Sequence, residues 1–63
     1  MIFQERTYSV LIVTATDSFT EKIMPLLPVT DYWPVTTVHS IGEARRKIVE
    51  TAFDIVLINA PLP

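Results

Sequence analysis

The chain has 63 residues and no cysteine, so it has room for one small domain and cannot form a disulfide or a thiolate metal site. Its formal net charge of -2 and its pI near 5.0 give no basic surface of the kind that binds nucleic acid. Hydrophobic residues make up 49% of the sequence, but no apolar stretch approaches the roughly 18 residues of a membrane span, and the first residues do not resemble a signal peptide. We therefore expect a cytoplasmic domain that binds no cofactor and contacts neither nucleic acid nor membrane. The excess of apolar residues is expected to face another subunit or a missing half of the domain.

The first half of the chain predicts a strand followed by a helix. Tyr8–Val13 is a strand candidate because it is rich in β-branched residues and closes in a continuous apolar run. A turn over residues 14–17 follows, and the capping-box pattern from Ser18 to Glu21 predicts a helix that begins at Ser18. One apolar face of this helix would consist of Phe19, Ile23, Leu26 and Leu27. Pro25 interrupts the pattern, so we expect the helix to be short, kinked or restarted there.

The middle of the chain predicts a second strand and a second helix. Residues 28–34 contain two prolines and indicate a loop, and Val35–Val38 is a short β-branched strand. Ser40 to Glu43 forms another capping box at the start of a helix. The apolar face of this helix is expected to contain Ile41, Ala44, Ile48, Val49 and Ala52. The basic residues Arg45, Arg46 and Lys47 alternate with acids on the other face, which is typical of a solvated helix surface.

The last part of the chain predicts a buried strand. Ile55–Ile58 is too short for a helix and too apolar for a half-exposed strand, a pattern typical of a strand covered on both faces in a parallel sheet. Asn59 ends the apolar run, and Pro61 and Pro63 prevent it from continuing as a central strand. Asn59 would thus lie at the carboxyl end of the sheet, where ligands bind in open α/β folds.

The order of these elements predicts an α/β fold. Strand, helix, strand, helix and strand alternate with short connections, which favours right-handed crossovers and a βαβαβ unit with a parallel three-stranded sheet. An apolar strand such as Ile55–Ile58 is unfavourable at an open edge. We therefore expect a homodimer that shares the edge of this strand.

In this order and at these separations, the motifs resemble the amino-terminal half of a response-regulator receiver domain, the phosphoaccepting module of two-component systems. The matching segments are Val10–Val13 in the first strand, Ser40–Ala44 at the start of the second helix, Phe53–Ile58 in the third strand, and Asn59–Pro63, which has the spacing of the family's Asp-x-x-Met-Pro loop. The resemblance covers residues 9–63 and implies half of a flavodoxin-like receiver fold. Residues 1–63 would then be a single, partial receiver-like domain.

The resemblance also places a phosphorylation site at the carboxyl ends of the strands. In this family a histidine kinase donates a phosphoryl group to an aspartate, with help from Mg²⁺ and an acidic pair. The position that matches the phosphoacceptor is Asn59, and those that match the acidic pair are Thr14 and Ala15. None of these side chains is a carboxylate, whereas Mg²⁺ is normally held through one or two carboxylates. A neutral amide is also a poor nucleophile towards phosphorus, since carboxylate anions do this work in the family. Asp17 is the nearby acid, and we expect it to serve the start of the first helix.

We therefore expect a degenerate receiver, or pseudo-receiver, that has no catalytic residue and no metal ion. It would act in signal transduction through contact with a protein partner or an output domain. The main alternative is a phosphoacceptor receiver of a two-component phosphorelay whose aspartate has been replaced by Asn59. A nucleotide-binding half-domain of flavodoxin type is a third interpretation, but Gly42 is the only glycine available for a phosphate loop.

Other side chains have both a functional and a structural interpretation. His39 is a candidate for phosphotransfer, but a partly exposed histidine at the end of a strand is the simpler interpretation. Tyr32 and Trp33 are candidates for anchoring a partner or for covering the sheet or the first helix.

Overall fold

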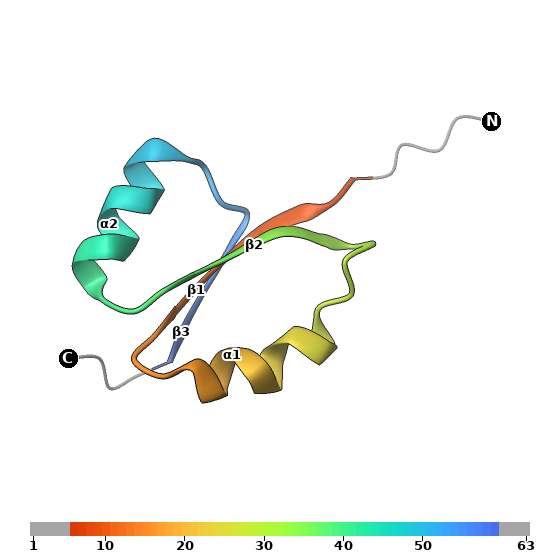
Figure 1. Cartoon of the computed structure of the whole chain (residues 1–63). Helices are drawn as coiled ribbons and strands as arrows, with labels where there is room; N and C mark the ends of the chain where they lie inside the picture. Colours follow the sequence, from red (N-terminus) through yellow and green to blue (C-terminus); the bar gives the residue numbers. More distant parts are fainter. Residues whose placement is uncertain (1–5, 60–63) are drawn as a thin grey trace.

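The computed structural model of the chain describes residues 6–59. The strands are β1 (Tyr8–Thr14), β2 (Tyr32–Val38) and β3 (Ile55–Asn59). The helices are α1 (Asp17–Ile23), the short 3-10 helix η1 (Met24–Leu26) and α2 (Ile41–Glu50). The strands form a parallel sheet in the order β2-β1-β3, with β1 in the middle (Figure 1). The predicted βαβαβ fold with three parallel strands is confirmed, and it is consistent with half of a flavodoxin-like fold.

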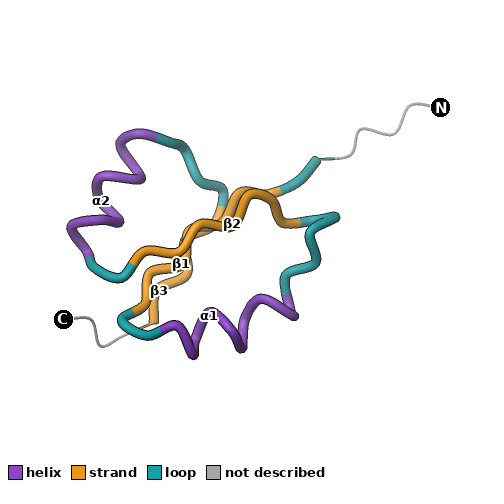
Figure 2. The backbone as a smooth tube through the Cα atoms, in the orientation of Figure 1, coloured by secondary structure: helices purple, strands orange, loops and turns teal. Residues whose placement is uncertain are grey.

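The two crossovers place the helices on opposite faces of the sheet (Figure 2). The first crossover leads from β1 outward to β2, and the second leads back past β1 to β3. Because both connections follow the right-handed rule but run in opposite directions along the sheet, α1 covers one face and α2 covers the other. No helix within residues 6–59 is long and apolar enough to cross a membrane.

The core of the molecule is β1. Its residues from Val10 to Thr14 are all fully buried, because this strand has a neighbour on each side and a helix on each face. On the α2 face the core cluster contains Leu11, Val13, Val38 and Ala44, with Phe53 packed against it. The continuous apolar run that predicted a strand within Tyr8–Val13 is therefore the centre of the sheet.

Helix α1 differs in detail from its prediction. It begins at Asp17 with Thr16 as N-cap, so the predicted start at Ser18 is wrong by one residue. The N-cap makes no side-chain hydrogen bond to the helix, and the Thr16 hydroxyl instead lies 3.1 Å from the Ser18 hydroxyl. The expected interruption at Pro25 is confirmed, because the α-helix ends at Ile23 and a 3-10 turn over Met24–Leu26 follows. Leu26 is exposed and does not belong to a buried helix face.

The predicted loop over residues 28–34 is shorter than expected. β2 begins at Tyr32, and Pro34 is part of it. This is possible because β2 is an edge strand with an irregular register, in which Tyr8 pairs with Tyr32 but Val10 pairs with Val35. Pro34 therefore lies at an irregularity within the strand, whereas Pro28 belongs to the turn that precedes it.

Helix α2 follows its predicted start but not its predicted packing. The Ser40 hydroxyl accepts a hydrogen bond from the backbone N–H of Glu43 at 3.2 Å, which confirms the cap. Of the predicted apolar face only Ala44 is buried, whereas Val49 is 86% exposed and Ala52 lies beyond the end of the helix at Glu50. Ala44 belongs to the core cluster with Leu11, Val13 and Val38, whereas Ile41 and Ile48 are 43% and 50% exposed.

The prediction that Ile55–Ile58 is covered on both faces is wrong for the residues that the structure describes. β3 is an edge strand, and alternate residues differ in burial, with Val56 and Ile58 exposed and Ile55 and Leu57 half-buried. Its apolar pattern is that of an interior strand, but its place in the sheet gives it one neighbour. The strand also includes Asn59, while Pro61 and Pro63 lie outside the described residues.

Candidate functional site

The structure brings two of the predicted site residues together at the carboxyl edge of the sheet. Thr14 is the last residue of β1 and Asn59 is the last residue of β3, and the two are direct partners in the parallel ladder. The Asn59 side-chain amide donates a hydrogen bond from Nδ2 to Thr14 Oγ1 at 3.2 Å. The sequence pattern predicts that both residues lie at the carboxyl ends of their strands. In the structure their side chains are also in contact.

The hydroxyl of Thr14 is fully occupied by local hydrogen bonds. It donates to the backbone C=O of Thr16 at 3.0 Å and accepts from the Thr16 N–H at 3.3 Å, besides accepting from Asn59. A threonine hydroxyl has one donor hydrogen and two acceptor lone pairs, so these contacts use its whole capacity. Thr14 is also fully buried, and it therefore has no lone pair to offer to a cation.

The remaining predicted residues lie around this pair but do not join it. Ala15 is exposed and carries no polar side-chain atom. Asp17 is the first residue of α1, so its negative charge lies at the positive end of the helix dipole, the role expected of it. Its Oδ1 lies 2.8 Å from His39 Nε2, which joins the start of α1 to the chain that follows β2.

The contact between Asp17 and His39 is a surface contact. The side chain of Asp17 is 78% exposed and that of His39 is 49% exposed, so water competes for both groups. The sequence pattern predicts a partly exposed histidine at a strand end, which the structure confirms, but not its partner. No sequence signal pairs these residues, because the sheet alone brings the two loops together.

The side chains at the carboxyl ends of the strands offer few groups that could bind a metal ion or accept a phosphoryl group. A magnesium site needs several oxygen ligands in octahedral order, and Asp17 is the sole carboxylate among the predicted site residues. Within residues 6–59 no group of three or more histidine, cysteine, aspartate or glutamate side chains is close enough to hold a metal ion. The neutral pair of Thr14 and Asn59 can close the end of the sheet, but it can neither attack a phosphorus atom nor neutralise a cation.

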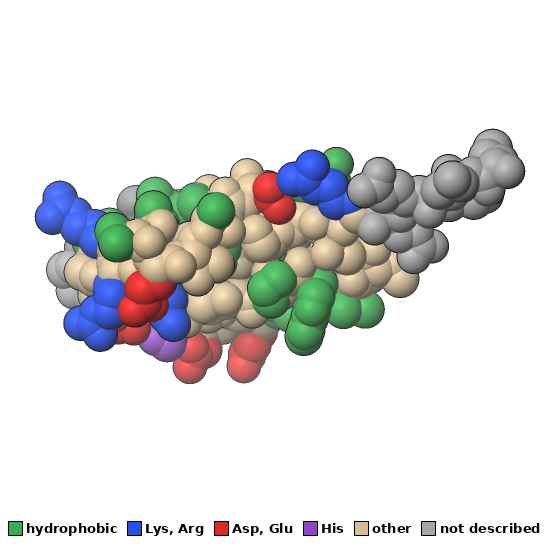
Figure 3. All heavy atoms as spheres, turned by 90° about the horizontal axis from the view of Figure 1, so that it is seen from above, with side chains coloured by type: hydrophobic (Ala, Val, Ile, Leu, Met, Phe, Trp, Pro, Cys, Tyr) green, Lys and Arg blue, Asp and Glu red, His purple; other side chains and the backbone are tan. Residues whose placement is uncertain are grey.

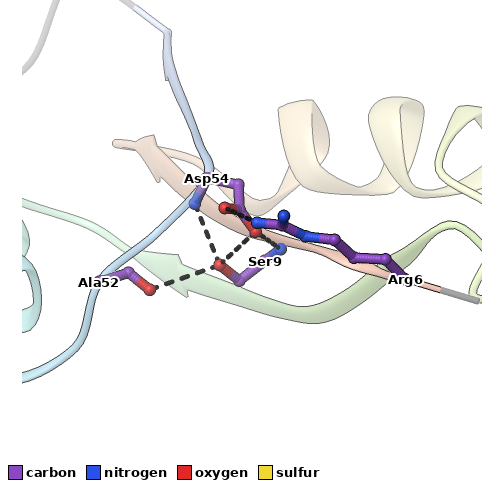
Figure 4. A network of polar contacts seen from close by, with 4 residues as sticks. All are labelled: Arg6, Ser9, Ala52 and Asp54. Carbon is purple, nitrogen blue, oxygen red and sulfur yellow. Dashed lines mark hydrogen bonds and ion pairs between the residues drawn. The ribbon is translucent and has the colours of Figure 1, made fainter. Parts of the chain in front are cut away.

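A second polar cluster lies at the amino end of the sheet and joins β3 to β1 (Figure 4). The Asp54 carboxylate accepts a hydrogen bond from the Ser9 N–H at 2.9 Å, and the Asp54 N–H donates to the Ser9 hydroxyl at 3.0 Å. The Ser9 hydroxyl also lies 3.4 Å from the Ala52 carbonyl, to which it can donate. Arg6 completes the cluster through an ion pair of 3.2 Å between Nη2 and Asp54 Oδ1. We name this group of residues, Arg6, Ser9, Ala52 and Asp54, the Asp54 clamp.

The clamp perturbs the acid at its centre. The hydrogen bond from the Ser9 N–H, supported by the charge of Arg6, holds the pKa of Asp54 below its ordinary value of 3.8, although partial desolvation acts in the opposite direction. The carboxylate is therefore ionised at neutral pH and ties the start of β3 to the start of β1. The segment Phe53–Ile58, which resembles the family's third strand, includes Asp54 but does not indicate this role. The sequence signal that could have indicated this contact is Ser9 near the start of one strand and Asp54 just before the next parallel strand.

Comparison of the chain with protein-family models, with curated proteins and with solved structures finds no match.

Proposed function

We propose that the chain is a degenerate receiver-like module that acts in signal transduction through protein contact and without phosphorylation. Its partner would be another protein or an output domain. The observation that supports this proposal is the hydrogen bond between the neutral amide of Asn59 and the saturated hydroxyl of Thr14. The resemblance would require a phosphoacceptor carboxylate and a metal-binding acid at these two positions. The absence of cysteine from the sequence is compatible with a cytoplasmic location, which we include in the proposal.

The physical reason for a silent site is electrostatic. Transfer of a phosphoryl group to a receiver-type site uses a carboxylate as the nucleophile and cations that neutralise the charge developing on the phosphoryl oxygens. Asn59 supplies no charge, and the lone pairs of Thr14 are already used. Asp17 is directed at His39 and has its own role at the start of α1. Function is then left to the surfaces of the module, and the exposed apolar residues of α2 and β3 are the natural contact sites.

The proposal is tested by adding beryllofluoride and Mg²⁺ to the protein and recording the amide NMR spectrum. We expect no specific shifts at Thr14 or Asn59, because beryllofluoride mimics a phosphoryl group only on a carboxylate with a bound cation. Asp17→Asn is the matched control, since it removes the nearby acid and leaves the strand ends intact. Specific shifts at Thr14 and Asn59 in the wild-type protein would contradict the proposal, and their loss in Asp17→Asn would identify Asp17 as the carboxylate that binds the beryllofluoride.

The alternative, a phosphoacceptor receiver whose aspartate was replaced, makes a different prediction. In that case Asn59→Asp should restore labelling by acetyl phosphate in the presence of Mg²⁺. Under our proposal Asn59→Asp remains unlabelled, because Thr14 and Ala15 still supply no carboxylate to hold the cation. Labelled protein would therefore favour the alternative.

A further inference from the structure

The outer edge of β3 is the feature of the molecule that the proposed function leaves unused, and its hydrogen-bonding groups follow from the bonds of β1. The Ser9 N–H and C=O both face β3, because they bond to Asp54 Oδ2 at 2.9 Å and to the Asp54 N–H at 3.1 Å. The neighbouring Tyr8 N–H faces β2, where it donates to the Asp31 carbonyl at 2.8 Å. Successive residues of a strand alternate in direction, so every second residue from Ser9 onward, beginning with Leu11, faces β3.

This alternation fixes which groups of β3 lie at its free edge. In a parallel ladder a residue that faces its neighbour bonds to the residues on either side of its partner. Leu11 faces β3 and has Val56 as its partner, so it bonds to Ile55 and Leu57, and these two residues face β1. Val56 and Ile58 therefore direct their N–H and C=O groups outward, and no strand within residues 6–59 pairs with them.

The side chains along this edge are apolar and exposed. Val56 and Ile58 are partners of Leu11 and Val13 and lie with them on the α2 face, but they are 41% and 60% exposed. β3 contains no charge and no proline, which are the usual means of preventing strand addition at an edge. Apolar side chains also reach the surface in the view from above, some of them in groups apart from the charged residues (Figure 3). The edge therefore offers both free backbone groups and apolar surface to another strand.

We propose that β3 pairs with β3 of a second copy of the chain, antiparallel and centred on Leu57. In this register Val56 lies opposite Ile58 of the partner subunit, and each such pair exchanges its outward N–H and C=O groups as a hydrogen-bonded pair. Leu57 lies on the twofold axis, opposite Leu57 of the partner subunit, in a non-hydrogen-bonded pair. Among pairings confined to β3, only this centre uses every outward backbone group of Val56 and Ile58. The two sheets become one continuous sheet that ends in β2 on both sides.

A second copy fits this edge for reasons of symmetry and charge. A twofold contact requires a surface that is complementary to itself, and a strand without charge meets its copy without repulsion. The incoming strand must be apolar on both faces to cover Val56 and Ile58 on one face and Leu57 on the other, and β3 has this composition. The opposite edge of the sheet contains Pro34 and an irregular register, which disfavours open-ended growth through β2. The assembly thus closes as a dimer.

Light scattering on the 63-residue chain, with a substitution at the edge, tests the pairing. The wild-type chain should be a dimer of 7.1 kDa subunits, and Ile58→Lys should raise the dissociation constant by about tenfold or more, because it places two like charges beside the twofold axis. Leu26→Lys is the matched control, since it also replaces an exposed apolar residue by lysine, but on η1. Circular dichroism on both variants checks that each is folded. A monomeric wild-type chain, or equal effects of the two folded variants, would overturn the proposal.

Single cysteines test the register and do not depend on the lysine variants. The chain contains no cysteine, so each variant has one thiol. Residues opposite each other in a non-hydrogen-bonded pair have Cα atoms about 4.5 Å apart, within the range that a disulfide spans. Mild oxidation should therefore cross-link Leu57→Cys to a covalent dimer in much higher yield than Val56→Cys or Ile58→Cys, whose thiols lie diagonally apart. A yield that peaks elsewhere, or no cross-linked dimer, would overturn this register.

The two proposals can fail separately. This inference extends the contact role of the proposed function, but it depends on the geometry of β3 and not on the state of Asn59. Phosphorylation of the chain would contradict the proposed function and leave the dimer intact. A monomer whose β3 edge pairs with a strand of a different protein would overturn the dimer and leave the silent receiver-like module intact.

Discussion

The two edges of the sheet are built differently, although each has a single neighbour in β1. β2 is seven residues long, contains Pro34, and changes register between its pairs with Tyr8 and Val10. β3 is five residues long, keeps one register with β1 throughout, and carries neither charge nor proline. β2 is therefore an edge at which the sheet ends, whereas β3 is an edge at which the sheet can continue. The difference lies in backbone regularity and in the proline of β2 rather than in charge or hydrophobicity, because both strands are uncharged and contain apolar residues.

The two edges also differ in how they are attached to the rest of the molecule. The Asp54 clamp holds the amino end of β3, and the hydrogen bond between Asn59 and Thr14 holds its carboxyl end. The carboxyl end of β2 is joined to α1 through the exposed contact of His39 with Asp17. A strand with few side-chain contacts above it, such as β3, depends more on polar attachments of this kind. Three substitutions, taken from the largest expected effect to the smallest, test this difference.

The largest effect is expected in β1, which supports both edges. Leu11→Ala removes a fully buried side chain that lies in the core cluster with Val13 and Val38. It should lower the free energy of unfolding by about 2–5 kcal/mol, because the lost transfer free energy is increased by the cavity that remains. Urea denaturation followed by circular dichroism at one fixed protein concentration measures this loss. The matched control is Leu26→Ala, whose side chain is 71% exposed and should cost no more than about 0.5 kcal/mol. Similar losses in the two variants would mean that Leu11 is not part of the core.

A smaller effect, confined to one edge, is expected from Asp54→Asn. The pKa of Asp54 is lowered in the folded protein, so its carboxylate stabilises the fold above the ordinary value of 3.8, and this stabilisation is lost as the pH falls through the lowered pKa. Asp54→Asn should be less stable than the wild-type protein at neutral pH and should lose this part of the pH dependence. Amide hydrogen exchange in β3 should increase more than exchange in β2.

The control for this variant is Asp31→Asn, because Asp31 bonds to β1 through its backbone carbonyl, which the substitution leaves in place. Free energies of unfolding measured across the acid range compare the two variants. An acid dependence in Asp54→Asn equal to that of the wild-type protein would show that the clamp does not stabilise β3.

The smallest effect is expected at the end of β2. His39→Gln removes the charge-capable partner of Asp17 from an exposed contact, and such surface pairs contribute about 0–1 kcal/mol. We expect a change in the free energy of unfolding of less than about 0.5 kcal/mol, and no change in hydrogen exchange within β3. Thermal or urea denaturation at neutral pH measures it. A loss larger than that of Asp54→Asn would show that β2 depends on polar attachment more than β3 does.

Much of the fold is determined locally by the sequence. The continuous apolar run of β1, the β-branched residues of Val35–Val38, and the cap of α2 at Ser40 each specify their element through short-range chemistry. The interruption of the first helix at Pro25 follows from a missing N–H group, which no tertiary contact can replace. The alternation of these elements is then sufficient to predict a parallel sheet with right-handed crossovers. For the same reason, the alignment of Thr14 with Asn59 could be predicted from the ends of their strands.

Only the tertiary structure decided which strand is central and which side chains are covered. Val10–Val13 and Ile55–Ile58 have the same apolar character, yet the first is buried in the middle of the sheet and the second lies at its edge. Composition cannot separate them, because burial depends on the number of neighbours that the topology supplies. The Asp54 clamp and the contact of His39 with Asp17 join residues 45 and 22 positions apart, so they too arise only when the sheet brings distant loops together.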